Sequence, residues 1–379
     1  FQIIGDLSKS NYEKIKTWQG EYTFVERFVF DGESAKMVAN KIKVKLPSEF
    51  ITIQKGKFTF CIDILTDSLF VDYLHESISL EDLSGNSIPL KKDAQNNLDD
   101  MLMHVVSIVT PKEFYSFYKN HTLGSYPDLG DRIDRGGRVA FRYPSMDTAT
   151  KIIAVLVDPR KFMICGDEFF WERCQEIASK IHPLHIKTDE SDSNLYLNEI
   201  VDSKSVRYQI YNDFNGEDHT VFEYIVDGNS AFNVIKYANG AGFIDKGYTM
   251  HEKNICEYKK VDDVYIPSIV EKNLGETSKK GLFQSSNRYE LVKAEINKPI
   301  PADFFTIKQL GLENGDRFYD EIENKLFDVV DNGKIIPMKP GTSISWQPKR
   351  ISIIRIVLIV IGCLSVLIGI YRQIRRRKQ

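Results

Sequence analysis

The sequence predicts an α+β fold, in which helices pack against a large, curved, mostly antiparallel sheet, with a helical insertion and one C-terminal transmembrane helix. Three observations lead to this prediction. Apolar residues alternate along many short segments, which is the period of a half-buried strand. Turn residues separate those segments too closely for parallel neighbours, which need long crossovers. Finally, an apolar run of about 20 residues, the length that crosses a bilayer, lies near the end of the sequence.

The N-terminal part, residues 1–95, is expected to be a short helix followed by a meander of strands. Ser10 and Glu13 have the spacing of a capping box, which predicts a helix over residues 10–18. The next segment, "EYTFVERFVF", alternates with Glu26 as the exception, and its aromatic residues on one side are Tyr22, Phe24, Phe28 and Phe30. The segments "KFTFCIDIL" and "SLFVDYL" repeat this pattern, so further strands are expected there.

Residues 96–189 are predicted to be a helical insertion. Helix-like patterns occur around residues 99–106, 111–119 and 168–181, separated by the glycine-rich and charged "LGDRIDRGG". The last of these patterns places one apolar face toward the sheet, formed by Phe170, Cys174, Ile177 and Ile181.

Strand patterns resume over residues 190–310, where turn signals such as "FNGED", "VDGNS" and "KVDDV" divide seven segments. Such short turns predict a run of antiparallel hairpins. Residues 338–350, which contain Pro, Gly and Ser, are interpreted as a short linker.

Residues 351–371 are predicted to form a single membrane-spanning helix. Arg355 lies one turn from the start of this segment, where its long side chain reaches the headgroups. A buried core helix is the alternative, but the length favours a span. The following tail, 372–379, carries five basic residues that indicate its retention in the cytoplasm: Arg372, Arg375, Arg376, Arg377 and Lys378.

This orientation places an ectodomain, residues 1–337, on the outer side of the cytoplasmic membrane, which is the periplasmic side in a cell with two membranes. Trp346 is well placed for the outer membrane interface. The sequence starts at Phe1 without a charged and apolar leader, so the simplest expectation is that a signal peptide was removed or omitted.

Composition excludes several classes of protein. The ectodomain is long enough for a substantial core, and 18 Tyr and 23 Phe argue against disorder. The formal net charge of −3 gives no strong field to attract nucleic acid, so no nucleic-acid partner is expected.

Four cysteines lie in the predicted ectodomain, where disulfides are permitted. Cys165 and Cys174 are close enough in sequence to close a short loop, which would leave Cys61 and Cys256 to pair. Four buried free thiols are an equally good interpretation, and the pairing stays open.

The sequence shows no convincing catalytic or metal-binding motif. His182 and His185 flank a proline and lack the glutamate of a zinc peptidase pair, and "DESDSN" lacks the glycine and terminal glutamate of a calcium loop. No nucleophile elbow or phosphate-binding loop appears. We therefore expect a non-catalytic protein without a cofactor or metal.

Several segments resemble the lipoprotein carrier family of the bacterial envelope. They are the helix and strand of "NYEKIKTWQGEYTFVERFVF" and the late segments "EYKKVDDVYIPSIVEKN" and "RYELVKAEINKPIPADFFTI". The resemblance covers residues 7–73 and 195–307 and brings no catalytic or ligand-binding motif. It implies an incomplete barrel around a helical lid that shelters acyl chains in an apolar hollow.

Aromatic residues on the strand faces are the candidates to line such a hollow: Phe24, Phe28, Phe58, Phe60, Phe222 and Tyr224. The alternative is that these rings fill a solid core, as aromatic stripes at strand period usually do. The first alternative predicts a membrane-anchored protein that binds a lipid or an acylated lipoprotein. The second predicts an interaction or sensor ectodomain that partners another envelope protein.

Overall fold

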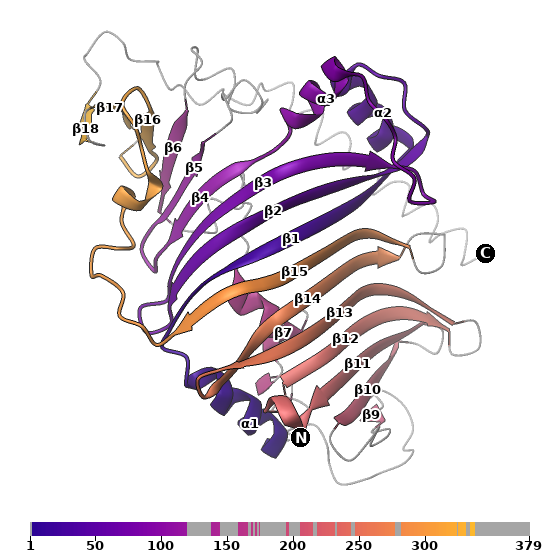
Figure 1. Ribbon diagram of the computed structural model, residues 1–379. Helices are drawn as coiled ribbons and strands as arrows, with labels where there is room; N and C mark the ends of the chain where they lie inside the picture. The colour runs from indigo at the N-terminus through magenta and orange to yellow at the C-terminus, as the bar shows by residue number, and fades with distance from the viewer. Residues whose placement is uncertain are drawn as a thin grey trace, which may run out of the picture.

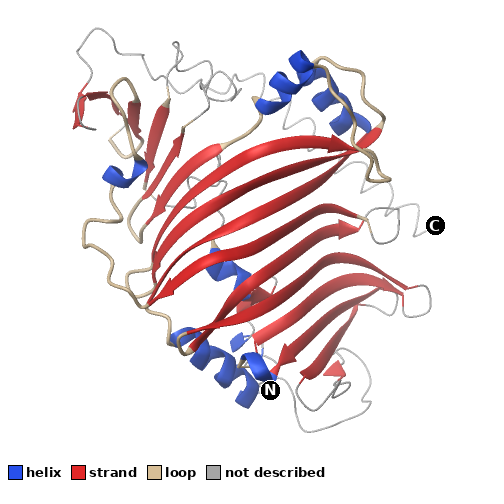
Figure 2. Cartoon of the chain, in the orientation of Figure 1, coloured by secondary structure: helices blue, strands red, loops and turns tan. Residues whose placement is uncertain are grey.

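The computed structural model describes residues 2–119, 138–144, 158–165, 168–169, 171–172, 174, 195–196, 205–214, 218–231, 233–243, 247–276, 282–323, 325–330 and 334–337. Sixteen of the described strands form one large, curved sheet (Figure 1). Helices are few and short beside it (Figure 2). The predicted large, curved, mostly antiparallel sheet is therefore confirmed.

The elements run in the following order along the chain. The N-terminal half contains α1 (Gln2–Glu13), β1 (Thr17–Asp31), α2 (Gly32–Ile42), β2 (Glu49–Asp63), β3 (Ser68–Glu81), α3 (Lys92–Asp99), β4 (His104–Val109), β5 (Phe114–Tyr118) and β6 (Val139–Tyr143). A 3₁₀ helix, η2 (Pro159–Met163), and the short strands β7 (Ile164–Cys165) and β8 (Glu168–Phe169) follow. The remaining elements are β9 (Leu195–Tyr196), β10 (Ser205–Phe214), β11 (Asp218–Asp227), η3 (Gly228–Ser230), β12 (Asn233–Phe243), β13 (Gly247–Val261), β14 (Val264–Glu276), β15 (Phe283–Ile296), η4 (Ile307–Leu310), β16 (Arg317–Asp320), β17 (Lys325–Val330) and β18 (Lys334–Pro337).

Strand order in the sheet places the first strand of the chain beside a late one. The order is β18-β17-β16-β6-β5-β4-β3-β2-β1-β15-β14-β13-β12-β11-β10-β9, so β1 lies beside β15. From β10 to β15, each strand pairs with the next one in antiparallel orientation, which confirms the predicted run of hairpins. Strands β6 and β16 are parallel, and ion pairs between Arg138 and Asp316 and between Arg142 and Asp320 hold them together, each at 2.7 Å.

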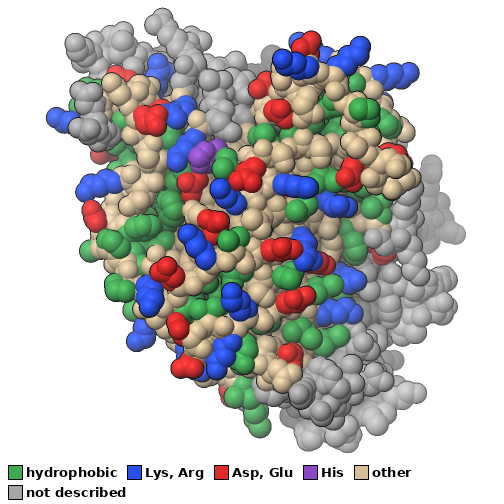
Figure 3. Space-filling view, in the orientation of Figure 1, with side chains coloured by type: hydrophobic (Ala, Val, Ile, Leu, Met, Phe, Trp, Pro, Cys, Tyr) green, Lys and Arg blue, Asp and Glu red, His purple; other side chains and the backbone are tan. Residues whose placement is uncertain are grey.

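The two faces of the sheet differ because side chains alternate along each strand. On β1, Trp18, Tyr22 and Phe24 are buried on one face, which we call the inner face. The η2–β7 segment passes behind the strands in Figure 1, against this inner face. The opposite, outer face carries scattered lysine, arginine and acidic side chains (Figure 3), as expected for a sheet with one face toward solvent.

The predicted helical insertion is wrong over its first part. Residues 104–109 and 114–118 are strands β4 and β5, and β6 continues the same sheet. These strands lack an alternation of apolar and polar residues because both of their faces are covered. On β4, four consecutive residues are buried. The outer face of this part packs on the C-terminal elements, in a cluster of Val106, Ile108, Phe117, Ala140, Leu310, Phe318 and Val329.

Two helix boundaries also differ from the predictions. The helix α1 ends at Glu13 rather than continuing to Trp18, because the Asn297 side-chain oxygen accepts hydrogen bonds from the backbone N–H groups of Lys16 and Thr17 and starts the strand. Of the predicted helix at 168–181, residues 168–169 are strand β8, and most of the remainder lies outside the described residues.

The far end of the inner face is covered by α2 and α3. Ala35, Val38 and Ile42 of α2 and Leu98 of α3 pack on Phe50, Ile78 and Leu80 of the sheet. This second cluster lies at the opposite end of β1, β2 and β3 from α1, as Figure 1 shows.

Among the described helices, none is both long and apolar enough to cross a bilayer. The predicted linker 338–350, span 351–371 and tail 372–379 lie outside the described residues, together with Trp346, Arg355 and the five basic tail residues Arg372, Arg375, Arg376, Arg377 and Lys378.

Candidate functional site

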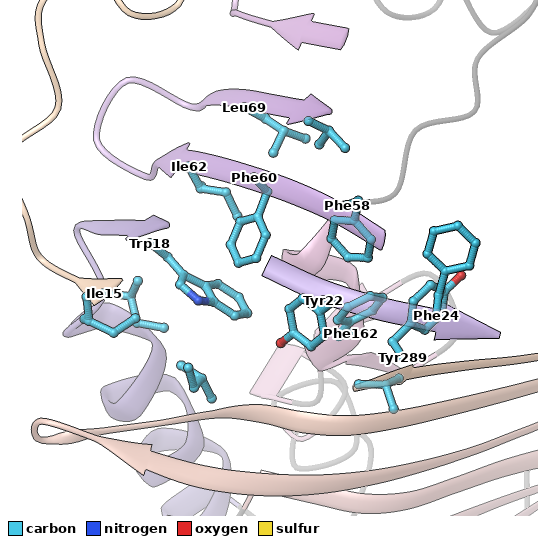
Figure 4. Close-up of a cluster of buried hydrophobic side chains, with 14 of the residues drawn as sticks. Ile15, Trp18, Tyr22, Phe24, Phe58, Phe60, Ile62, Leu69, Phe162 and Tyr289 are labelled. Atoms are coloured by element: carbon cyan, nitrogen blue, oxygen red, sulfur yellow. The ribbon is translucent and has the colours of Figure 1, made fainter. Parts of the chain in front are cut away.

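The inner face carries one large aromatic cluster at the centre of the sheet (Figure 4). It draws side chains from β1, β2, β3, β13, β14 and β15, because the pairing register places alternate residues of each strand in one layer. We call this group the inner cluster: Ile15, Trp18, Tyr22, Phe24, Phe58, Phe60, Ile62, Leu69, Val71, Tyr73, Phe162, Cys256, Val264, Ile266, Val270, Tyr289 and Ile296.

Ring contacts hold the sheet side of the inner cluster together. Phe24 and Tyr73 stack with centroids 4.6 Å apart, and Tyr22 and Phe58 stack at 5.3 Å. These are offset or parallel arrangements within the range that stabilises aromatic pairs. The strands therefore present a nearly continuous wall of rings to the inside.

Phe162, an aromatic side chain from outside the sheet, covers part of this wall. Phe162, in η2, lies with its ring centroid 4.8 Å from that of Tyr289, 5.3 Å from Tyr22 and 6.3 Å from Phe58. Figure 4 shows its ring between those of Tyr22 and Tyr289. Because η2 has five residues, the cover over this part of the wall is a single short turn.

Polar contacts of its second and third residues hold η2 in place. Lys272 Nζ donates to the carbonyl of Lys161 at 3.1 Å and lies 5.5 Å from the Phe162 ring centroid, a cation–π distance. Arg160 forms ion pairs with Asp158 at 2.8 Å and with Asp67 at 2.5 Å. The turn is thus attached to the sheet by charged side chains as well as by the Phe162 ring.

A glycine makes room for the wall at Phe24. At Gly56 a β-carbon would meet the Leu74 carbonyl oxygen at 2.0 Å and the Phe24 ring at 2.6 Å. The register of β2 against β3 shifts at this point, between Lys55 and Gly56. Gly56 therefore permits both the bulge and the position of the ring above it.

A buried polar group adjoins the inner cluster where the alternation of β1 is interrupted. Glu26 is 8% exposed, and its carboxylate lies 3.6 Å from His75 Nε2 and 3.5 Å from the Tyr289 hydroxyl. The Tyr73 hydroxyl lies 2.9 Å from the same His75 nitrogen. An acid, an imidazole and two phenols thus meet beside the aromatic wall.

The backbone fixes the state of His75. The Met103 N–H donates to His75 Nδ1 at 3.2 Å, so Nδ1 carries a lone pair and the proton is on Nε2. The Nε2–H therefore turns toward Glu26 and Tyr73. Burial, reinforced by the nearby Glu26 charge, raises the pKa values of Tyr73 and Tyr289, so both phenols remain protonated.

The predicted hollow residues divide between different places. Phe24, Phe58 and Phe60 are 2%, 0% and 3% exposed in the inner cluster, so protein atoms already cover them. Phe28 is half-buried further along β1. Tyr224 is buried on β11, where its ring packs 5.2 Å from that of Tyr237, and the side chain of Phe222 lies outside the described residues.

The predicted disulfides are not formed in the structure. Cys61, Cys174 and Cys256 are buried free thiols, which is the alternative left open by the sequence, and the Cys165 side chain lies outside the described residues. Cys61 lies between Phe60 and Ile62, which face the inner cluster, so its thiol points to the opposite face from Cys256. Their strands β2 and β13 are also four positions apart in the sheet.

A surface hollow of about 510 Å³ lies elsewhere, between α1 and the turn that joins β13 to β14. Its polar side chains hold backbone: Asn11 both donates to and accepts from Tyr265, and Asn297 binds Lys14 and Lys16. Within the described part of the chain, no three His, Cys, Asp or Glu side chains are grouped to hold a metal ion.

Comparisons with known proteins give a coarse likeness in structure. No protein-family model matches the chain, and a search of curated protein sequences gives no match. An outer membrane lipoprotein-sorting protein domain from Vibrio parahaemolyticus aligns over 81% of this chain and 98% of its own, with 9% identity and a TM-score of 0.32. A DUF1329 family protein from Desulfovibrio piger aligns over 81% and 97%, with 11% identity and a TM-score of 0.28.

Both TM-scores are too low for either protein to define this chain. The description of the fold rests on the strand pairing, and the candidate site rests on the contacts of the inner face. Sequence reasoning found the aromatic side of this site but missed Tyr73, His75 and Tyr289. The one available signal was Glu26, an acid at a position whose neighbours in phase are aromatic.

Proposed function

We propose that the protein binds the acyl chain of a lipid or acylated lipoprotein on the inner face of its sheet, without catalysing a reaction. The observation that carries this proposal is that the ring of Phe162, on a five-residue turn, covers the rings of Tyr22, Phe58 and Tyr289. An acyl chain would take the place of that ring when η2 moves away.

Burial of methylene groups offsets the loss of the Phe162 contacts for an acyl chain that is exposed to water. Removing a buried phenylalanine ring from its contacts costs about 3–5 kcal/mol, the range of measured Phe→Ala values. Each methylene that moves from water into an apolar site contributes about 0.8 kcal/mol, so about four to six methylenes offset that cost.

The predicted C-terminal span adds a location to the proposal. A protein anchored in the cytoplasmic membrane with residues 1–337 outside would receive or hand on acylated molecules at the outer surface of that membrane. Unlike a soluble carrier, it would remain in place.

A photolabelling experiment tests the proposal on the full-length protein in phosphatidylcholine vesicles. The probe is a phospholipid with a photoactivatable group in its acyl chain, and labelled peptides are mapped by mass spectrometry. We expect label on β1, β2 and η2. Label confined to residues 351–371 would contradict the proposal, because that segment meets bilayer lipid in any case.

A second candidate is a protein-interaction or sensor ectodomain with a filled core. The low exposure of Phe24, Phe58 and Phe60 favours it, since these rings already have protein neighbours. It predicts that no acyl chain reaches the inner face and that a membrane or envelope protein is recovered with the chain after cross-linking in cells.

A further inference from the structure

The helix α1 lies across one end of the sheet, at the lower edge of Figure 1. The Ser8 hydroxyl donates to the side chain of Asn233, at the start of β12, at 3.2 Å. The Asn11 side chain donates to the carbonyl of Tyr265 in β14 at 2.8 Å, and Asn297, which follows β15, binds backbone groups just after the helix. We call this surface the α1 end, and it consists of α1, residues 14–16, the β2–β3 turn at 64–67 and residues 297–298.

The helix α1 leaves apolar side chains exposed although it packs against the sheet. Ile3 and Leu7 lie one turn apart on the same face and are 75% and 43% exposed. The side chains that hold the helix to β12 and β14, Ser8 and Asn11, are polar and are each 3% exposed. The helix therefore has an apolar strip that the sheet does not use.

The β2–β3 turn adds a third apolar side chain to the α1 end. Leu65 is 77% exposed. The N–H of its neighbour Ile64 donates to the carbonyl of Lys16 at 2.9 Å, so the turn lies beside the residues that follow α1. Large apolar side chains gathered at one exposed surface are typical of an interaction site.

Three exposed lysines at the α1 end have no acidic partner. Lys14 and Lys16 follow α1, and Lys298 follows β15. The Thr17 hydroxyl donates to the Lys298 carbonyl at 2.7 Å, which places Lys298 beside the start of β1. Within the part of the chain that the structure describes, none of these lysines forms an ion pair. Three nearby acids already have basic partners, while Asp262 forms no ion pair: Glu13 pairs with Lys9, Asp67 with Arg160 and Asp263 with Lys260.

We propose that the α1 end docks on a bilayer surface that contains anionic phospholipids. Ile3, Leu7 and Leu65 enter the layer beneath the head groups, as the apolar face of an interfacial helix does. The lysine stems lie along this layer and their ammonium groups reach the phosphates, which complement the excess of positive charge. The inference goes beyond the proposed function, since it needs no acyl chain on the inner face.

A bilayer fits this surface better than a second copy of the chain does. A two-fold dimer through the α1 end would bring the lysines of one copy toward those of the other, and like charges repel. Lysine is also depleted in protein interfaces. The predicted linker, residues 338–350, extends over no more than about 45 Å, so it would keep the ectodomain close to the bilayer.

Photolabelling of the full-length protein tests the inference in vesicles of phosphatidylcholine, with or without phosphatidylglycerol. The probe is phosphatidylcholine with a photoactivatable group beside the ester of its acyl chain, and label is expressed relative to that on residues 351–371. Each lysine near an anionic surface contributes about a factor of five. We therefore expect label on residues 2–16 and 64–67 to rise about tenfold or more when phosphatidylglycerol is present.

Lys14→Gln combined with Lys298→Gln should reduce this rise to a few-fold. Lys41→Gln combined with Lys45→Gln is the matched control, because these exposed lysines lie at the α2 end of the sheet, and it should keep the wild-type rise. Equal label on residues 2–16 in both kinds of vesicle would overturn the inference. Label on α2 without label on α1 would overturn it as well, because the opposite end of the sheet would then face the bilayer. Label on β1, β2 and η2 from the deeper acyl-chain probe, with none at the α1 end, would overturn this inference and leave the proposed function intact.

Discussion

Replacing Phe162 with alanine separates the two roles of this ring, in packing and in covering the aromatic wall. The ring is 7% exposed and contacts Tyr22, Phe58 and Tyr289, so its loss removes nearly a full set of core contacts. We expect about 3 kcal/mol of destabilisation from this truncation. Loss of the Lys272 contact adds about 0.5–1 kcal/mol.

The same free energy opposes ligand entry if an acyl chain must displace the ring. A barrier of about 3 kcal/mol corresponds to about a hundredfold in apparent affinity, since about 1.4 kcal/mol is a factor of ten. Phe162→Ala should therefore bind the acyl-chain probe up to about a hundredfold more tightly, measured as the probe concentration that gives half-maximal labelling.

Phe318→Ala provides the matched control for this prediction. Phe318 is 5% exposed, but it lies in the cluster of the C-terminal strands, away from the inner face. Its truncation should cost a similar free energy of unfolding in urea while leaving the labelling unchanged. If both variants alter labelling equally, general loosening explains the effect, and the covering role of Phe162 is refuted.

Three further predictions concern the framework around the site. Gly56→Ala should lower the free energy of unfolding in urea by about 2 kcal/mol, because the new β-carbon overlaps a carbonyl oxygen and a ring; an unchanged value would contradict the close approach. Arg142→Gln should lower the free energy of unfolding by about 3 kcal/mol, because it leaves Asp320, whose side chain is 4% exposed, without its charged partner. Arg288→Gln removes a more exposed ion pair with Glu271 and should lower the free energy of unfolding by less than about 1 kcal/mol. Equal losses in the two variants would refute this reasoning. Burial raises the pKa values of three thiols, those of Cys61, Cys174 and Cys256, to about 12. Alkylation at pH 8, mapped by peptide, should therefore modify these thiols after unfolding and leave them unmodified in the native protein. Their modification in the native protein would contradict their burial.

The sequence predicted the central strands well because one face of each strand is buried and the other is in solvent. Tyr22 and Phe24 alternate with exposed residues on β1, and the turns between β10 and β15 are short enough to require antiparallel pairing. The prediction failed at β4 and β5 for the opposite reason. Both of their faces are covered, so "VVSIV" and "FYSFY" lack a period of two.

The candidate site was half predictable for a related reason. Aromatic residues in phase identify a wall of rings, but they do not show what covers it. Phe162 reaches the wall from a segment about a hundred residues or more away in sequence from the strands on either side of β1. The surroundings of Glu26 were invisible for a similar reason. Its partners His75 and Tyr289 come from other strands, whose register, including a shift between Glu21 and Tyr22, is fixed only in the assembled sheet.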